Sequence, residues 1–425
     1  MSAEIARLSP RRERAPRNAT DLGAAGSHDA APPPGAPHAV YLQSFAVHYE
    51  YPVCFTEHLF APGNPVFRDT LRRREPGRRH RFVVFVDGSV AASFPSLAHD
   101  IAGYASCHAD AIELAAPPEV LPGGESVKND PALVTRLQHW LVEHGIDRHA
   151  FVVGIGGGAM LDLVGFVAAS THRGIRHVRV PTTVLAQNDS GVGVKNGVNA
   201  FGVKNLLGAF APPFAVLNDA DFLRTLQPRD KIAGMAEAVK VALIRDRGFF
   251  EWLEASAEAL RACEPAAMNR MIRRCAELHM RQIAHGGDPF ESGSARPLDY
   301  GHWSAHKLEA LTAHELRHGE AVAIGLALDT RYAVQVGMLA AGGEERVCAL
   351  LERLGFDLWH PMLEARDVTG QLLLLRGLQD FREHLGGELT ITLLRDIGVG
   401  EEVHQMDGAE ILRALAWLHG RERGA

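Results

Sequence analysis

The sequence predicts an α/β half followed by an all-α half. Up to about residue 218, apolar runs that end in Gly, Asp-Gly or Pro alternate with a helical stretch, as in the βαβ units of a nucleotide-binding sheet. From about residue 219 onward, apolar residues recur at spacings of three and four, which is the helical period. We therefore predict a disordered extension (1–38), an α/β domain (39–218) and a helical domain (219–425).

Three apolar runs in the first half have the pattern of buried parallel strands. They are RFVVFVDGSV (81–90), FVVGIGGGAM (151–160) and HVRVPTTV (177–184), the last ended by Pro181. The helical stretch ALVTRLQHWLVEHG (132–145) separates the first two and ends at Gly145. This order predicts a Rossmann-like sheet.

Four segments of the second half have the helical period. They are RDKIAGMAEAVKVALIRD (229–246), AAMNRMIRRCAELHMRQIA (266–284), HWSAHKLEAL (302–311) and GEAVAIGLALDTRYAVQVG (319–337). We expect each segment to form one helix.

The composition excludes several classes of protein. The chain has 425 residues, of which 46% are hydrophobic and 22% charged, and its net charge of −7 provides no basic surface for nucleic acid. No apolar stretch approaches the roughly 18 residues that a membrane span needs. The five cysteines form no CxxC pair, so we expect reduced core residues in a cytoplasmic protein. Residues 1–38 lack the apolar segment of a secretory signal.

Lysine is scarce in this chain. Only six of the 44 basic residues are Lys, at positions 128, 195, 204, 231, 240 and 307. A retained Lys suggests a site that needs a compact ammonium group instead of the planar fork of Arg. The alternative is that these six positions have no common cause.

A glycine-rich turn follows the second predicted strand. Gly156, Gly157 and Gly158 would let the backbone approach a pyrophosphate at the start of the next helix. Asp87 ends an earlier strand, where an acid can accept hydrogen bonds from ribose hydroxyls, although it could equally be a simple turn residue. Lys128 lies in a further loop, GESVK (124–128), together with an acid.

The stretch PTTVLAQNDSGVGVKNGVNAFGVKNLLGAF (181–210) is long, polar and rich in glycine. Its density of glycine would let a loop wrap closely around a small ligand. Asp189, Lys195, Lys204 and Asn205 in this stretch suit phosphate and hydroxyl groups. A flexible surface loop is the alternative, but the apolar residues of the stretch argue against it.

A third group of residues has the composition of a metal site. His302 and His306 lie four apart on one predicted helix, and His318 precedes the next. Glu237 and Lys240 lie three apart on another helix. Histidine and carboxylate ligands from separate helices suit zinc or a similar divalent ion, although most of the 22 histidines must have other roles.

Taken together, these motifs resemble the sugar phosphate cyclases, whose type member is 3-dehydroquinate synthase. The resemblance is collinear over about residues 80–335. The matching strings are GGGAMLDLVGF, HRGIRHVRVPTTVLAQNDSGVGVKNGVN, KNLLGAF, GMAEAVKVALI, GHWSAHKLEA and RHGEAVAIG.

The resemblance implies an enzyme that uses NAD and a divalent metal, zinc or cobalt, to cyclise a sugar phosphate without net oxidation. The implied metal ligands are Glu237, His302 and His318. The implied NAD-binding residues are Asp87, Glu125, Lys128, Gly157, Gly158, Asp162, Thr182 and Thr183. The implied substrate residues are Asp189, Lys195, Asn205, Lys240 and His306. Arg173 matches an arginine that reaches the phosphate pocket of a neighbouring subunit, which implies a homodimer.

Some positions depart from the dehydroquinate synthase pattern. His279 and Asp299 replace a Lys and an Asn, Ala295 replaces an Arg with Arg296 one place away, and RGLQDFREHLGGEL (376–389) contains no Lys. Missing cations disfavour a substrate carboxylate, and an Asp prefers hydroxyl groups. The strings RPLDYGH and GVGVKNGVN resemble those of the valiolone-type cyclases, and we expect sedoheptulose 7-phosphate as substrate. The alternatives are a dehydroquinate synthase that acts on 3-deoxy-arabino-heptulosonate 7-phosphate, a metal-dependent alcohol dehydrogenase and a non-catalytic binding protein.

Overall fold

The computed structural model describes residues 43–201, 203–286, 290, 297–384 and 389–422. Tyr49–Ala425 forms one compact unit, separate from Met1–His48. Residues 43–48 contain no helix or strand. The extension predicted at 1–38 lies outside the described residues.

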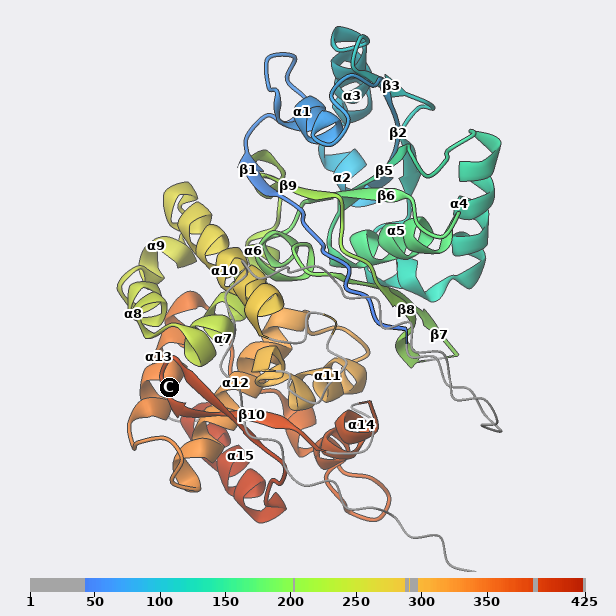
Figure 1. The fold of residues 1–425 in the computed structure, drawn as a ribbon. Helices are drawn as coiled ribbons and strands as arrows, with labels where there is room; N and C mark the ends of the chain where they lie inside the picture. The colour runs from blue at the N-terminus through green and yellow to red at the C-terminus, as the bar shows by residue number, and fades with distance from the viewer. Residues whose placement is uncertain (1–42, 202, 287–289, 291–296, 385–388, 423–425) are drawn as a thin grey trace, which may run out of the picture. The chain divides into compact units, whose positions relative to one another are not determined.

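A seven-stranded parallel sheet organises the first half of the compact unit (Figure 1). The strand order is β1-β9-β6-β5-β2-β3, and β4 also pairs with β2. The strands are β1 (Val53–Thr56), β2 (His80–Asp87), β3 (Ile112–Leu114), β4 (Glu119–Leu121), β5 (Phe151–Gly156), β6 (Arg176–Pro181) and β9 (Ala215–Asp219). The three predicted strands are therefore present as the neighbours β2, β5 and β6.

Helices cover both faces of this sheet because successive side chains of a strand point to opposite sides. On β2, Phe82 and Val84 pack in the core with α1 and α3, whereas Val83 and Phe85 pack with α4 and α5. The helices of this half are α1 (Val66–Arg72), α2 (Gly88–Ser93), α3 (Leu97–Cys107), α4 (Pro131–Glu143) and α5 (Gly158–Ser170). The predicted nucleotide-binding architecture is confirmed.

The glycine-rich stretch after β6 is not the irregular loop that we expected. It forms a short π-helix, η2 (Ala186–Ser190), and then two antiparallel strands, β7 (Lys195–Ala200) and β8 (Val203–Phe210). Buried Asn196 holds this shape, because its side-chain amide donates to the carbonyls of Val194, Ala209 and Ala211. The prediction failed because strand pairing here depends on contacts beyond the local sequence.

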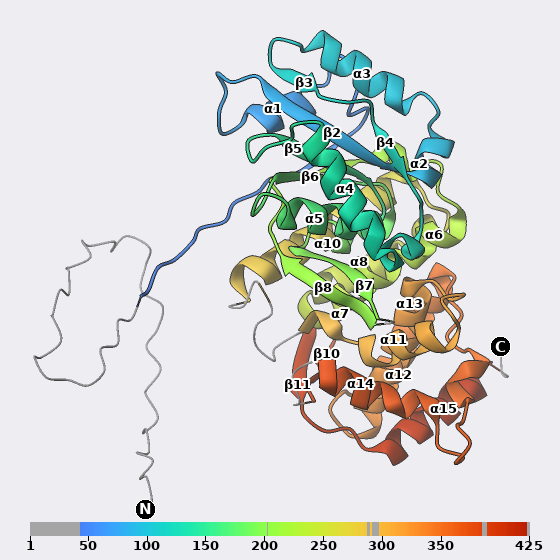
Figure 2. The same cartoon turned by 90° about the vertical axis from the view of Figure 1, so that its right-hand side faces the viewer.

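The second half is mainly helical (Figure 2). Its helices are α6 (Pro228–Ala233), α7 (Met235–Arg245), α8 (Arg247–Ala255), α9 (Ala257–Arg261), α10 (Pro265–His285), α11 (His302–Leu311), α12 (His318–Gln335), α13 (Gly343–Leu354), α14 (Arg376–His384) and α15 (Gly408–Glu422). It also contains an antiparallel strand pair, β10 (Ile391–Asp396) and β11 (Val399–Val403), so the all-α prediction was wrong there. Gly398, with φ of 90°, makes the tight turn between the two strands.

The helix predicted over 229–246 is divided at Gly234. A side chain there would place Cβ 2.5 Å from Cβ of Val184. The Asn188 amide also donates to the Gly234 carbonyl at 2.8 Å. Contacts from the first half of the chain therefore separate α6 from α7.

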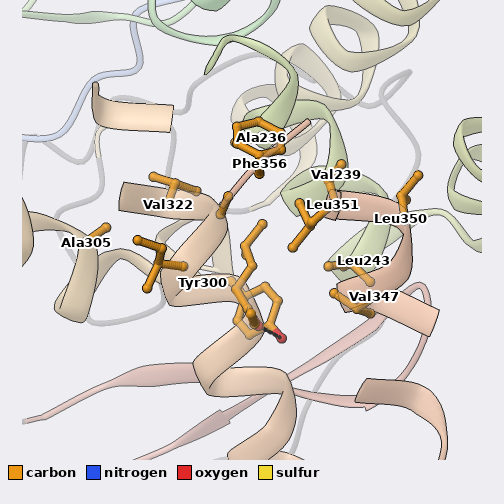
Figure 3. Close-up of a cluster of buried hydrophobic side chains, with 14 of the residues drawn as sticks. Ala236, Val239, Leu243, Tyr300, Ala305, Val322, Val347, Leu350, Leu351 and Phe356 are labelled. Carbon is orange, nitrogen blue, oxygen red and sulfur yellow. Dashed lines mark hydrogen bonds between the residues drawn. The ribbon is translucent and has the colours of Figure 1, made fainter. Parts of the chain in front are cut away.

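One apolar core joins the helices that carry the predicted metal ligands (Figure 3). Val239 of α7, Ala305 of α11 and Val322 of α12 are fully buried in it, together with Leu351 of α13. Interiors of this kind pack nearly as densely as organic crystals, so the relative positions of these helices are tightly constrained.

Two further sequence expectations concern membranes and cysteines. None of the helices in the described part of the chain is long and apolar enough to cross a membrane. All five cysteines are free, and Cys275 and Cys348 are buried. Cys107 is exposed, so the expectation of a core position was wrong for that residue.

Candidate active site

The predicted NAD-binding residues gather at the carboxyl ends of neighbouring strands. Asp87 ends β2, Gly157 and Gly158 follow β5, and Thr182 and Thr183 follow β6. Because β2, β5 and β6 are adjacent and parallel, these ends meet at one edge of the sheet. Open α/β sheets bind their ligands at such edges.

The turn from β5 into α5 admits only small residues. A side chain on Gly158 would place Cβ 2.7 Å from the Ser190 hydroxyl, and one on Gly156 would place it 2.6 Å from Met160 Cγ. Gly157 is the N-cap residue of α5, a helix of 13 residues. Because glycine has no side chain, it accepts no hydrogen bonds from the first amides of the helix through a side chain. A helix start of this kind favours a phosphate group, so the residues present fit the pyrophosphate of a dinucleotide.

Lys128 connects three elements beside this turn. Its buried ammonium group donates to Asp162 Oδ2 of α5 at 2.7 Å and contacts the side-chain oxygen of Asn205 on β8. Lys128 and Glu125 both belong to one 3₁₀ turn, η1 (Glu125–Asn129). The structure thus places Asn205, a predicted substrate residue, with the predicted cofactor residues.

The three predicted metal ligands come together from three helices. Glu237 lies in the first turn of α7, and His302 and His318 are the first residues of α11 and α12. Oε1 of Glu237 is 3.5 Å from Nε2 of His302 and 3.4 Å from Nε2 of His318. One potential ligand atom from each residue lies within 4.8 Å of the others. A carboxylate with two imidazoles is a donor set of catalytic zinc sites.

Glu237 is buried, and the groups around it shift its pKa. Burial alone would raise its pKa, but Lys240 and the imidazoles of His302 and His318 hold that pKa well below its usual range. Lys240 forms an ion pair with Oε2. Within the described residues, neither carboxylate oxygen has a hydrogen bond of standard geometry. Buried oxygens of this kind beside two imidazole nitrogens fit a divalent cation.

A second carboxylate, Glu309, lies on the other side of His318. Its Oε2 is 3.2 Å from Nδ1 of His318, and its Oε1 is 3.3 Å from Nζ of Lys204. Burial would lower the pKa of His318, but Glu237 and Glu309 together raise it to about 9. The sequence analysis did not identify Glu309, although its position seven residues after His302 on one helix could have indicated it.

The predicted substrate residues Asp189 and Lys240 lie next to this cluster. Asp189 Oδ1 and His279 Nδ1 share a hydrogen bond of 2.6 Å. Burial would raise the pKa of Asp189, but Lys240 and His279 lower it. Burial would likewise lower the pKa of Lys240, but Glu237, Asp189 and Asp299 raise it. In the sequence, His279 and Asp299 were noted only as departures from the dehydroquinate synthase pattern. In the structure, His279 lowers the pKa of Asp189 and Asp299 raises that of Lys240.

The remaining predicted residues are more exposed. The ring of His306 lies 5.4 Å from that of His302 and 6.0 Å from that of His318. Desolvation around this ring and the two neighbouring imidazoles hold the pKa of His306 well below its usual range. Lys195 is exposed at the start of β7, and Arg173 is exposed in a turn between α5 and β6. Ala295 and Arg296 lie outside the described residues.

This combination of a parallel sheet with a glycine-rich turn and a Glu/His/His cluster on helices defines a class of enzymes that pair a dinucleotide with a metal ion. Family models match most of the folded chain: the 3-dehydroquinate synthase N-terminal model matches residues 119–233 and the C-terminal model residues 234–375. A 3-dehydroquinate synthase from Cereibacter sphaeroides is 39% identical over 301 residues, covering 69% of this chain and 79% of that protein. The chain belongs to the 3-dehydroquinate synthase family of sugar phosphate cyclases.

Two solved structures share the architecture. The 2-epi-5-epi-valiolone synthase from Streptomyces hygroscopicus subsp. jinggangensis, with NAD⁺ and Zn²⁺ bound, has a TM-score of 0.77 and 29% identity, covering 90% of this chain and 100% of its own. A 2-deoxy-scyllo-inosose synthase in complex with carbaglucose-6-phosphate, NAD⁺ and Co²⁺ has a TM-score of 0.66 and 25% identity, covering 83% and 92% of the two chains. Cyclases with this architecture are thus named for different products.

Proposed function

We propose that this protein catalyses the cyclisation of a C7 sugar phosphate, with sedoheptulose 7-phosphate favoured. The reaction class is phosphate elimination followed by intramolecular aldol closure. The observation that carries the choice of substrate is the hydrogen bond of His279 with Asp189, together with the negative charges of Asp189 and Asp299 near Lys240.

The cofactors of the proposed reaction are NAD and a divalent metal, zinc or cobalt. The glycine turn, Asp87, Lys128 and Thr182 would hold NAD at the strand ends. Glu237, His302 and His318 would hold the metal. When bound, NAD supplies a reversible hydride acceptor and the metal a Lewis acid for a carbinol oxygen.

The substrate end next to His279 is proposed to be uncharged. His279 uses Nδ1 in its bond with Asp189, which leaves its other ring nitrogen for a hydroxyl group. Asp299 lowers the positive potential around Lys240, to which it is electrostatically coupled. A carboxylate would need further cations here, since a buried charge without a partner costs about 3–5 kcal/mol. A hydroxymethyl group needs only hydrogen bonds.

The other residues of the chain have distinct proposed roles. The ammonium group of Lys240 stays protonated between Glu237 and Asp189 and donates to substrate hydroxyls. Lys195 and His306 bind the phosphate and stabilise the charge that develops as it leaves. Arg173 would join them from a second copy of the chain, in a cytoplasmic homodimer.

The second candidate is a 3-dehydroquinate synthase that acts on 3-deoxy-arabino-heptulosonate 7-phosphate. The names of the most similar sequence relatives favour it. Under this alternative Arg296 would bind the substrate carboxylate.

Comparison of kcat/KM on the two C7 substrates separates the candidates. We expect the value for sedoheptulose 7-phosphate to exceed that for the heptulosonate by about a hundredfold or more, the equivalent of about 3 kcal/mol. Released phosphate gives the rate and NMR identifies the carbocycle. Equal or faster turnover of the heptulosonate, abolished selectively by Arg296→Ala, would establish the second candidate.

The redox balance tests the cyclase reaction against a dehydrogenase. Because the hydride would leave and return within one turnover, phosphate release should continue while no net NADH accumulates. Formation of one NADH per phosphate, followed by absorbance, would replace the proposal with a dehydrogenase function.

A further inference from the structure

Arg179 is a fully buried arginine without an ion-pair partner among the described residues. It lies in the middle of β6, and its relative exposure is 0%. Nη1 donates to the carbonyls of Gly191 at 3.1 Å and Gly193 at 2.9 Å. Nη2 donates to the carbonyl of Lys195 at 2.9 Å and to the side-chain oxygen of Asn196 at 2.7 Å. All four acceptors belong to the segment 191–196.

Burial of this cation is costly. An ionised group loses its hydration in the interior and is normally paired with an opposite charge. Desolvation accordingly lowers the pKa of Arg179. The compensation comes from four acceptors on one short segment, which a planar guanidinium can bind in a fixed geometry and a lysine cannot.

The segment bound by Arg179 connects two residues of the proposed substrate site. Asp189 lies in η2, two residues before the segment begins, and the amide of Val192 donates back to the Asp189 carbonyl at 3.2 Å. Lys195 lies within the segment, with its carbonyl fixed and its side chain exposed. Tyr51 adds a further contact, because its hydroxyl donates to the Val192 carbonyl at 2.8 Å. Two glycines lie in the segment, so its backbone has little rigidity of its own.

We propose that Arg179 is a positioning residue for substrate binding: its guanidinium fixes the backbone of 191–196 so that Asp189 and Lys195 face the substrate at a constant separation. The predicted effect on catalysis rests on the proposed function. That Arg179 fixes the segment does not depend on it, because the hydrogen bonds are within the chain. Arg179 is not a catalytic residue, because its four side-chain hydrogen bonds go to protein groups.

The test uses Arg179→Gln and Arg179→Lys in the metal-loaded, NAD-bound enzyme. Arg176→Gln is the matched control, because Arg176 lies on the same strand but pairs with Glu75 near the surface. Hydrogen–deuterium exchange of a peptide that covers 189–197 reports the fixing of the segment. The consequence for the site is measured by KM and kcat for the sugar phosphate, by the Kd of NAD and by the zinc content. Thermal unfolding identifies variants that fail to fold.

We expect both Arg179 variants to exchange this peptide at least about tenfold faster, since local opening cheaper by 1.4 kcal/mol gives that factor. We expect KM to rise about tenfold or more, while kcat falls less than KM rises and NAD and zinc binding stay unchanged. Unchanged exchange in a folded variant, or an equal effect of Arg176→Gln, would overturn the inference. Restoration of wild-type KM by Lys would also overturn it, because charge alone would then suffice. If the wild-type enzyme turns over no sugar phosphate, the proposed function fails, whereas the exchange data still decide whether Arg179 fixes the segment.

Discussion

The two halves of this chain hold their functional side chains in different ways. In the α/β half, most predicted cofactor residues lie at strand ends and in turns, whereas Asp162 lies on α5, and the glycines of the turn into α5 leave no room for side chains. In the helical half, Glu237, His302 and His318 lie at the starts of three helices that share one apolar core. Loops define the first region and packed helices the second.

This difference predicts how well each region tolerates substitutions. A turn built from glycine backbone should keep most of its affinity for a ligand when a neighbouring side chain changes, because its own atoms remain in place. A cluster of buried charged groups has no such tolerance, because loss of one member leaves the others unpaired. Substitutions in the two halves should therefore have separable effects on NAD and on metal, and unequal ones on activity.

The largest effect is expected from the metal cluster. Glu237→Gln keeps the shape but removes a ligand charge and the ion pair with the buried ammonium of Lys240. Breaking a buried ion pair costs about 3–5 kcal/mol, so zinc should be lost and turnover should fall by at least about a hundredfold. His302→Ala and His318→Ala should behave alike. Zinc content by mass spectrometry and phosphate release measure the two effects.

Glu344→Gln is the matched control for this substitution. Glu344 is also buried and pairs with Arg331 at 2.7 Å, but it belongs to α13, outside the metal cluster. We expect this variant to lose some stability and to keep its zinc and its turnover. Full activity of Glu237→Gln in chelator-treated buffer would contradict the assignment.

A smaller and different effect is expected from Lys128→Met in the α/β half. The substitution removes a cation that binds Asp162 and Asn205 beside the glycine turn. Loss of hydrogen bonds from a charged donor costs about 2 kcal/mol, so the Kd of NAD should rise about thirtyfold. Zinc content should not change. Isothermal titration with NAD measures the Kd.

Lys307→Met is the control, because Lys307 pairs with Asp380 on α14. It should leave the Kd of NAD unchanged. Loss of zinc in Lys128→Met would show that the two regions are coupled, and would contradict the separable effects expected for the two halves.

The elements that sequence reasoning predicted best are those with strong local signals. The strands β2, β5 and β6 are continuous apolar runs, and α10, α11 and α12 have clear helical periods, so burial alone determines them. The predicted metal ligands Glu237, His302 and His318 lie close together, and each belongs to one of the motifs that carry the family resemblance. Periodicity and collinear motifs were sufficient there.

The failures occur where distant contacts determine local structure. Gly234 divides a predicted helix because Val184 and Asn188 pack against it from the other half. The β7–β8 pair forms in a stretch that looks like a loop, held by Arg179 and Asn196. Glu309 is a different case, because its position seven residues after His302 on one helix could have indicated it before its contact with His318 was known. The contacts of Gly234 and Arg179 join separate elements of the chain, which no local pattern encodes.

The smallest predicted effect concerns Asp329, which tests how firmly the helical half is fixed. Asp329 lies on α12, is fully buried, and accepts hydrogen bonds from the Trp303 indole at 2.9 Å and the Gly301 amide at 3.2 Å. It thereby holds the start of α11, where His302 lies. Burial raises its pKa from 3.8 to about 7, and the two hydrogen bonds only partly oppose this rise.

A carboxyl group with a raised pKa in the folded state favours folding while it is protonated. Its contribution is complete below the unfolded pKa of 3.8 and is lost as the pH rises through about 7. Between about pH 6 and 8, the free energy of unfolding should fall by roughly 1.4 kcal/mol from this group. Asp329→Asn cannot ionise, so that fall should be absent from its pH dependence. Thermal unfolding of the zinc-loaded proteins at both pH values measures the difference, and groups common to both proteins cancel. Parallel stability curves for the two proteins would show that Asp329 stays ionised in the fold, and that its two hydrogen bonds outweigh its burial.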